Sequence, residues 1–361
     1  MDTYLNPPQI FNSPPPRYAD SLRKFQGISG IEKTSSDRLW ATWYGGGLTE
    51  DNGNYVLLTT SPDNGETWSD VKLILDPGDD VRAYDPCLWN DPTGRLWLFW
   101  AQGYQNHTDA SAGVWAITTD NPQEEDPEWS TPKRLCDGIM MNKPTVLSSG
   151  EWLLSSATWF TEGSSTVYAS SDKGTTWQKR GAANVPVKDE RSCDEHMIVE
   201  RNDGSLWMLI RTNYGIGEST STDKGYTWTT ATPSSIQHLT SRVFIRRLNS
   251  GKLLLVKHGA MDQRLEDRSH LTAYLSSDDG HSWSNGFILD DRVGISYPDG
   301  FQSDDNAITI TYDFDRRGEM EILMTRFTEE DILLGKYISE KSLQRKLINK
   351  ATGENESNKE H

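Results

Sequence analysis

The stretch Ser221-Thr-Asp223-Lys-Gly225-Tyr-Thr227-Trp228 is one copy of the pattern that decides the fold of this 361-residue chain. The pattern, Ser-x-Asp-x-Gly-x-Thr/Ser-Trp, begins at Ser61, Ser170, Ser221 and Ser276, with intervals of 109, 51 and 55 residues. The longest interval spans two periods and contains a degraded copy that ends at Trp129. Asp and Gly favour a tight turn, and the hydroxyl groups satisfy backbone groups locally. We therefore expect the pattern to be structural.

A second marker, a turn followed by a short apolar strand, has the same period. Its six copies have Arg38, Arg95, Glu151, Ser205, Lys252 and Ala307 as their second residues, with spacings of 57, 56, 54, 47 and 55. Six repeats of about four strands each predict an all-β chain, a six-bladed β-propeller of four-stranded antiparallel blades. One such sheet cannot bury both faces alone, so the blades must pack around a common axis.

The repeats divide the chain into three parts. Residues 1–20 are expected to be an N-terminal extension, and residues 21–338 to form the propeller, with the last blade running from about Ser296 to Lys336. Residues 339–361 are polar and are expected to be a disordered tail, in which Leu343–Lys350 could form a short helix.

Composition and charge exclude several classes of function. The net charge is 36 − 53 = −17, and a surface this acidic repels phosphate backbones and anionic lipid, so neither nucleic acid nor a membrane is an expected partner. No apolar run approaches the roughly 20 residues that cross a bilayer, and the start of the chain does not resemble a signal peptide. The three cysteines are widely spaced, which fits a reducing, cytoplasmic compartment. The seven histidines show no metal-ligand spacing, and no metal or cofactor is expected.

Four such boxes at blade spacing resemble the Asp-boxes of the sialidase superfamily of six-bladed propellers, over about Phe25 to Lys336. Glu195 opens a strand, and Arg211 ends the next one sixteen residues later, as in that family. Arg268 stands 29 residues before Tyr297, which matches a second family arginine and the family tyrosine. The resemblance implies that Tyr297 is a nucleophile, Glu195 its base, and Arg211 and Arg268 ligands of a substrate carboxylate.

These residue types make chemical sense together. Sialic acids carry a carboxylate on the anomeric carbon, so an attacking carboxylate would meet like charge, whereas a neutral phenol does not. A neighbouring glutamate can take the phenol proton. Sialidases are accordingly an exception to the pair of carboxylates that most glycosidases use. Arginine suits a carboxylate ligand because its planar fork makes bidentate, charge-assisted hydrogen bonds.

The position of the general acid stays open between two residues. In the family, an acid/base aspartate lies on a loop of the first blade, about eleven residues before the first Asp-box serine. That interval ends at Glu50, whereas the residue type matches its neighbour Asp51. Either carboxyl group is a candidate to protonate a leaving oxygen.

The first blade departs from the family pattern. Sialidases open it with Phe/Tyr-Arg-Ile-Pro, and the arginine is the first of three that hold the carboxylate. Here Gln26 stands in its place, within Phe25-Gln26-Gly27-Ile28. Lys24, Arg82 and Lys143 are cations that could substitute, because Lys24 shares the strand parity of Gln26 and the other two open inner strands.

Two carboxylates complete the expected substrate-binding set. Asp85 follows Arg82 at the start of the second blade. Asp313, in Tyr312-Asp313, stands where sialidases place Tyr-Glu beside the missing arginine. An acid without its arginine suggests a rearrangement around Gln26.

The resemblance predicts an exo-acting glycoside hydrolase that removes a terminal acidic sugar, sialic-acid-like or uronic, from oligosaccharides. Two alternatives remain. One is a lyase that uses Tyr297 or His196 as base on a uronic acid. The other is a carbohydrate-binding propeller without catalytic activity, which would leave the spacing of Glu195, Arg211, Arg268 and Tyr297 unexplained.

Overall fold

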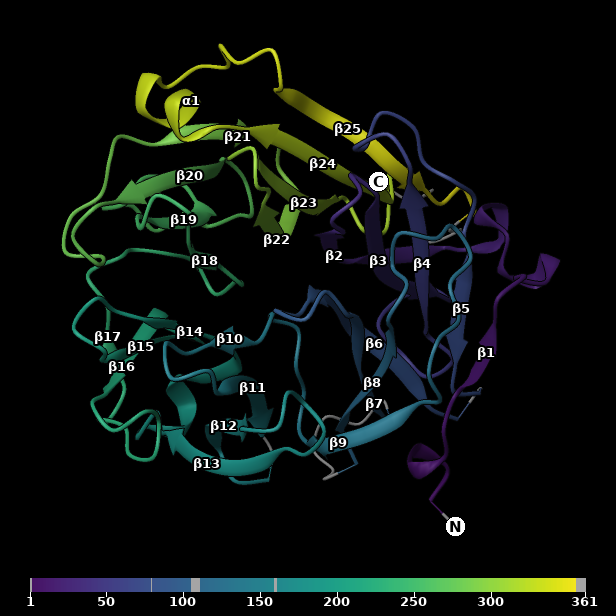
Figure 1. The fold of residues 1–361 in the computed structure, drawn as a ribbon, viewed down its shortest axis with the longest axis horizontal. Coiled ribbons are helices and arrows are strands. Elements are labelled where there is room, and N and C mark those ends of the chain that lie inside the picture. The colour runs from purple at the N-terminus through teal and green to yellow at the C-terminus, as the bar shows by residue number, and fades with distance from the viewer. Residues whose placement is uncertain (1, 79, 105–110, 159–160, 355–361) are drawn as a thin grey trace.

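Six antiparallel β-sheets surround a central axis in the computed structural model, which confirms the six-bladed β-propeller (Figure 1). The structure describes residues 2–78, 80–104, 111–158 and 161–354. Each blade runs outward from an inner strand, and the first four strands from the axis pair in the order in which they follow along the chain. Among the described residues, no helix has the length and apolar character needed to span a membrane.

The strands have the following bounds. Blades 1 and 2 contain β2 (Phe25–Lys33), β3 (Leu39–Gly46), β4 (Tyr55–Ser61), β5 (Leu73–Asp76), β6 (Arg82–Asn90), β7 (Leu96–Gly103), β8 (Gly113–Thr119) and β9 (Lys133–Asp137). Blades 3 and 4 contain β10 (Thr145–Val146), β11 (Trp152–Thr158), β12 (Ser164–Ser170), β13 (Gln178–Ala183), β14 (Arg191–Glu200), β15 (Leu206–Thr212), β16 (Gly215–Ser221) and β17 (Thr232–Pro233). Blades 5 and 6 contain β18 (Phe244–Arg247), β19 (Leu253–His258), β20 (Leu271–Ser276), β21 (Phe287–Asp290), β22 (Ile295–Gln302), β23 (Ile308–Phe314), β24 (Glu321–Phe327) and β25 (Leu343–Lys350).

The remaining elements are short. A strand, β1 (Gln9–Phe11), precedes the first blade, and one α-helix, α1 (Glu329–Leu334), joins β24 to β25. The described 3-10 helices span Thr3–Leu5, Pro16–Tyr18, Asp20–Leu22 and Lys188–Glu190.

Both sequence markers occupy one structural position in every copy. The turn marker lies between the first and second strands of all six blades, for example at Gly204, just before β15. Gly204 has a φ of 82°, a left-handed conformation that favours glycine. Each of the four Ser-x-Asp patterns starts at the last residue of a third strand: β4, β12, β16 or β20.

The Ser-x-Asp turn closes on itself through one hydrogen-bond network. In blade 4, Ser221 Oγ donates to Asp223 Oδ1 at 2.8 Å and accepts from the Gly225 amide at 2.8 Å. Asp223 in turn accepts from the amide and the hydroxyl of Thr227 at 2.9 and 2.7 Å. The same four bonds recur in the other three copies. The pattern is therefore scaffold, as expected.

We expect Ser221→Ala to lower the free energy of unfolding by about 1–2 kcal/mol, because it removes one bond to Asp223 and leaves the buried Gly225 amide without its acceptor. Urea unfolding measures the change. Ser235→Ala is the control, since Ser235 is exposed and its hydroxyl bonds to no described residue. Equal unfolding midpoints for the two variants would contradict the structural role of the turn.

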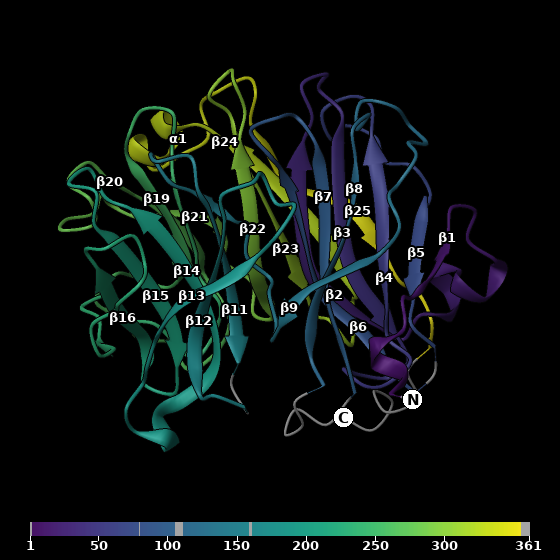
Figure 2. The ribbon, with the colours of Figure 1, turned by 60° about the horizontal axis from the view of Figure 1, so that its bottom comes forward.

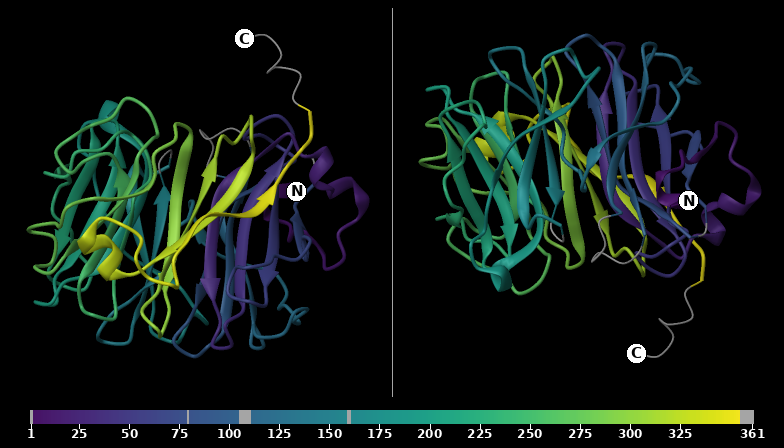
Figure 3. Two further views of the ribbon diagram at one scale, coloured as in Figure 1. Left: turned by 90° about the horizontal axis from the view of Figure 1, so that it is seen from above. Right: turned by 90° about the horizontal axis from the view of Figure 1, so that it is seen from below.

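The end of the chain differs from the prediction. The expected disordered tail and short helix are wrong over Leu343–Lys350, which forms β25, the outermost strand of blade 6, antiparallel to β24. Figure 3 shows this strand in yellow along the outer rim. An outermost strand buries few side chains, here chiefly Ile348 at 6% exposure, so its sequence is polar enough to look unstructured. Residues 355–361 of the expected tail lie outside the described residues.

The N-terminal extension also joins a blade. Its strand β1 pairs antiparallel with β5, with Gln9 opposite Asp76, and makes blade 1 five-stranded (Figure 2). Tyr18 anchors the segment that follows, because it is buried and its hydroxyl donates to Asp76 Oδ2 at 2.5 Å.

An ion-pair network crosses the axis and links five of the blades. The Lys143 amino group of blade 3 donates to the carbonyls of Ile31 and Leu88 at 2.7 and 2.6 Å. It also lies 3.2 Å from both Glu32 and Asp299. The Arg242 guanidinium lies 3.3 Å from Asp299, whose other oxygen accepts from the Ile31 amide. These buried charges fix the inner strands around the axis.

Candidate active site

Four inner strands carry a β-bulge at the same level. The register with the second strand shifts after Gly27 in β2, Tyr84 in β6, Asp194 in β14 and Ser296 in β22. The first bulge residues are Ile28, Asp85, Glu195 and Tyr297, and their φ values are 56°, 50°, 40° and 55°. A bulge re-aims a side chain, and non-glycine residues rarely adopt positive φ outside constrained sites. The repeat therefore presents one selected side chain from each of these blades.

Tyr297 and Glu195 meet although a whole blade separates them in the sequence. The Tyr297 hydroxyl donates to Glu195 Oε1 at 3.3 Å, and Arg211 Nη1 donates to both, at 3.2 Å to the hydroxyl and 2.5 Å to the carboxylate. Among the described residues, none donates a hydrogen bond to the buried Glu195 Oε2. Glu195 thus has an oxygen beside the phenol and a second one that can receive a proton.

The phenol is neutral in this environment. Burial raises the pKa of Tyr297 to about 12, and the Glu195 carboxylate adds to the rise, against the opposing effect of Arg211, Arg268 and Arg316. Tyr297 therefore needs an adjacent base to act as a nucleophile at neutral pH. Glu195 is in position to be that base.

Two further guanidiniums flank the ring of Tyr297. The Cζ atoms of Arg268 and Arg316 lie 5.1 and 5.2 Å from the ring centroid. The carbonyl of Arg268 accepts from the amides of Gly294 and Ile295, which fixes it beside the start of β22. No described carboxylate pairs with the Arg268 side chain. We call Tyr297, Glu195, Arg211, Arg268 and Arg316 the tyrosine site.

Arg316 is the member that the sequence analysis missed. It lies in the turn between β23 and β24, and its side chain covers Gly27 so closely that a Cβ there would lie 2.2 Å from Arg316 Cδ. The backbone carbonyl of Arg316 also accepts a hydrogen bond from the backbone N–H of Gln26 at 3.3 Å. Two features of the sequence point to Arg316. The pair Arg316-Arg317 follows shortly after Asp313, and a glycine stands next to Gln26. Because a closed propeller packs blade 6 against blade 1, these two segments can be expected to meet.

The structure does not bring Gln26 to the tyrosine site. The side-chain amide of Gln26 is fully buried. It forms hydrogen bonds with the side chains of Arg23, Trp43 and Asn349 and with the Met320 carbonyl, so it packs between the first and last blades. The expectation that Gln26 contacts substrate therefore finds no support in its placement.

Lys143 also lies elsewhere. Its side chain is 1% exposed and committed to the axial network, which contradicts the expectation that it faces the site. The sequence could not show this, because the partners of Lys143 come from blades 1, 2 and 6.

Asp313 stabilises the backbone around the tyrosine site through two hydrogen bonds. Its Oδ2 accepts from the Ile28 amide at 2.7 Å and its Oδ1 from Ser296 Oγ at 2.5 Å, so it joins the bulges of blades 1 and 6. Burial raises the pKa of Asp313, and the nearby Arg316 counteracts the rise. It holds the backbone beside Tyr297.

Glu50 and Asp51, on the loop between β3 and β4, have different surroundings. Glu50 Oε1 lies 2.6 Å from Arg316 Nη1. Burial raises the pKa of Glu50, but Arg316, Arg82 and Arg268 outweigh it, and the net pKa is below the ordinary value. Burial raises the pKa of Asp51, with only Arg82 opposing, so the pKa values of the two neighbouring carboxyl groups shift in opposite directions.

Arg82 and Asp85 form the blade 2 wall near this loop. The Arg82 guanidinium lies 3.9 Å from the Tyr84 ring centroid and bonds to the Tyr44 hydroxyl at 3.4 Å, and its buried Nε and Nη1 have no acceptor among the described residues. Burial raises the pKa of Asp85 to about 8, while Arg82 opposes and Glu50 and Glu195 add to the rise. At neutral pH this carboxyl group is therefore mostly protonated and can donate a hydrogen bond.

His196 points away from Glu195. Its Nε2 lies 2.9 Å from the Thr166 carbonyl of blade 3, and burial lowers its pKa to about 4. In this position His196 is poorly placed to act as the base of a lyase. The described residues contain no group of three or more His, Cys, Asp or Glu that could hold a metal ion.

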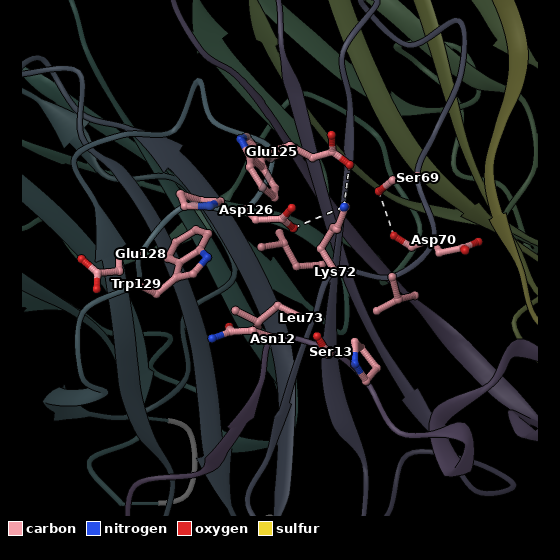
Figure 4. A pocket seen from close by; sticks show the side chains of 15 residues that line it. Asn12, Ser13, Ser69, Asp70, Lys72, Leu73, Glu125, Asp126, Glu128 and Trp129 are labelled. Carbon is pink, nitrogen blue, oxygen red and sulfur yellow. Dashed lines mark hydrogen bonds and ion pairs between the residues drawn. The ribbon is translucent and has the colours of Figure 1, made fainter.

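A separate groove of about 950 Å³ lies between blades 1 and 2, and Figure 4 shows its lining. Its one lysine, Lys72, is paired with Glu125 and Asp126 at 2.6 and 3.2 Å. The groove contains none of the predicted site residues, and its remaining charges are acidic. It does not suit an anionic ligand.

The comparisons with known proteins concern the family and the fold. A family model described as a BNR repeat-like domain matches residues 37–310. No curated protein matches the sequence.

Solved structures match the fold at low sequence identity. A protein of unknown function from Dyadobacter fermentans is 17% identical, with a TM-score of 0.65 over 83% of this chain and 93% of that one. A Hadza microbial sialidase is 16% identical, with a TM-score of 0.70 over 87% and 67%. The intramolecular trans-sialidase of Ruminococcus gnavus is 15% identical, with a TM-score of 0.69 over 90% and 98%. These likenesses concern the fold alone.

Proposed function

This chain belongs to the family of BNR repeat-like domains with a sialidase-like propeller fold, and from that premise we propose that it is an exo-acting glycoside hydrolase for an acidic terminal sugar. The observation that carries the proposal is the tyrosine site. A buried neutral phenol contacts a carboxylate at 3.3 Å and is surrounded by the guanidiniums of Arg211, Arg268 and Arg316. This arrangement suits attack next to a negatively charged group.

In the first step, Tyr297 Oη attacks the anomeric carbon while its proton passes to Glu195. The bond between the anomeric carbon and the leaving oxygen breaks, and Asp51 supplies a proton to that oxygen. Arg211 and Arg268 hold the substrate carboxylate through charge-assisted hydrogen bonds. Arg211 also bonds to the Tyr297 hydroxyl and to Glu195, so it aligns nucleophile and base.

In the second step, Asp51 takes a proton from water as the water attacks the glycosylated anomeric carbon. The tyrosyl oxygen leaves and regains its proton from Glu195. Two displacements at one carbon give overall retention of configuration. Released sugar observed by NMR before mutarotation would show the retained anomer.

The direct test is hydrolysis of a panel of fluorogenic glycosides: an α-linked N-acetylneuraminic acid, its deaminated analogue, a glucuronide and neutral sugars. We expect release from at least one acidic glycoside and none from the neutral ones. Exclusive turnover of neutral sugars would contradict the proposal. New ultraviolet absorbance from an unsaturated product would indicate the lyase, and saturable binding without turnover of natural acidic oligosaccharides would indicate a binding propeller.

Asp51→Asn should discriminate between leaving groups. We expect kcat/KM to fall by about 10²–10⁴-fold for a natural oligosaccharide, because its leaving oxygen needs a proton. The fall should be far smaller for an aryl glycoside with an acidic phenol as leaving group. Kinetics on both substrates measure the difference. Glu50→Gln is the matched control and should affect the two substrates alike; selectivity in Glu50→Gln rather than in Asp51→Asn would reverse the assignment.

A further inference from the structure

We propose that Arg316 is a third ligand of the substrate's anionic group, and that the Glu50 carboxylate occupies this position in the unliganded protein. The inference rests on the proposed function, since it names the residue that selects an acidic substrate at the same site. The turn between β23 and β24 would thus supply a ligand for the anionic group. The first blade cannot supply this ligand from Gln26, because the Gln26 side chain is hydrogen-bonded to Met320 and Trp43.

The surroundings of Glu50 identify an anion position. Its carboxylate lies 2.6 Å from Arg316 Nη1, and the guanidiniums of Arg82 and Arg268 are near enough to stabilise its charge as well. Arg316 and Arg268 both lie over the Tyr297 ring. A carboxylate of the protein therefore sits among cations that also border the proposed nucleophile, as a substrate carboxylate would.

Arg316 is built into the scaffold. Its guanidinium stem passes over Gly27, where no larger residue fits, and its backbone bonds to Gln26. The turn that carries it is closed by Asp315, whose side chain accepts from the amides of Gly318 and Glu319, both at 3.1 Å. The arginine is thus preorganised, and rigid ligands lose less entropy on binding.

Glu50 is the partner that can leave. Its side chain is 33% exposed and ends a flexible stem next to solvent, whereas Arg316 is fixed. When an anionic substrate bonds to Arg316, Glu50 can rotate outward, and one negative charge replaces another. Glu50 therefore competes with the substrate, and a neutral sugar gains nothing by displacing it.

A double-mutant cycle tests the exchange, with N-acetylneuraminic acid, glucuronic acid and their methyl esters as probes in calorimetric titrations of the full chain. Arg316→Met should weaken binding of the preferred acid by about 10- to 100-fold, the loss typical of one charged hydrogen-bonded contact. Glu50→Gln should strengthen it by about tenfold, because the competitor has lost its charge. In the Arg316→Met background, the gain from Glu50→Gln should be clearly smaller than in the parent, since the effects of coupled residues are not additive.

Gly27→Ala provides a second perturbation that leaves both charges present. A methyl group at this position must displace the Arg316 stem, so affinity for the acid should fall as in Arg316→Met. Unfolding midpoints establish which variants remain folded, and the methyl esters should bind all folded variants equally. Additive effects of Arg316→Met and Glu50→Gln, equal effects on acid and ester, or no binding of either acid by any variant would each overturn the inference.

These outcomes separate the inference from the proposed function. If anion binding depends on Arg316 but no glycoside is turned over, the proposed hydrolase activity is contradicted and the anion site is supported. If an acidic glycoside is turned over and its KM is unchanged in Arg316→Met, the hydrolase activity is supported and the role of Arg316 as a ligand is contradicted.

Discussion

Replacing Tyr297 with phenylalanine is expected to reduce kcat by about 10³-fold or more while the fold persists, because the variant lacks the attacking oxygen. The only described groups that hydrogen-bond to the hydroxyl are Glu195 and Arg211, so its loss leaves the ring packed against Arg268 and Arg316 as before. Kinetics on the best acidic glycoside of the panel, with the unfolding midpoint as a check on the fold, measure the effect.

Tyr214→Phe is the matched control. Its hydroxyl is also buried, but it lies outside the tyrosine site. Its removal should leave kcat within about twofold of the parent, as for a residue that takes no part in the transition state. If Tyr297→Phe kept more than about a tenth of the parent activity, a smaller loss than the loss of a nucleophile allows, the assignment would be wrong.

The second large effect concerns stability. We expect Asp299→Asn to lower the free energy of unfolding by about 3–5 kcal/mol, because removing one partner of a buried ion pair leaves charges uncompensated. Asp299 is 1% exposed and lies 3.2 Å from Lys143 and 3.3 Å from Arg242. Its substitution leaves Arg242 without a described carboxylate partner.

Guanidinium chloride unfolding measures this change. Glu162→Gln is the control, because Glu162 and its partner Lys179 are both about half exposed, and such surface pairs contribute about 0–1 kcal/mol. Comparable losses in the two variants would contradict the view that the axial network holds the blades together.

Local sequence signals predicted the fold well. A left-handed turn such as Gly204 and a closed Ser-x-Asp turn such as Ser221–Trp228 are set by residues a few positions apart, so they are visible in the sequence wherever they recur. The strand Leu343–Lys350 was missed because it sits at the rim, where pairing with β24 rather than apolar content keeps it in place. Strands of this kind carry little periodic signal.

The candidate site was only partly predictable. Tyr297, Glu195 and Arg211 occupy positions tied to bulges and strand ends, and the structure brings these three together. Arg316 and Lys143 depend on contacts between blades that are distant in the sequence. Arg316 reaches the site through ring closure against Gly27, and Lys143 is drawn into the axis by Asp299 and Glu32. No spacing within a single blade contains that information.

The central claim is that Tyr297 forms the covalent intermediate, and trapping it is the most direct measurement. A fluorinated analogue of the sugar released in the panel slows the second step, and mass spectrometry of the digested protein then locates the label. We predict one added sugar on the peptide that contains Tyr297, and none in Tyr297→Phe. Continued turnover of the parent glycoside with no label on Tyr297, or a label on another residue, would contradict the account.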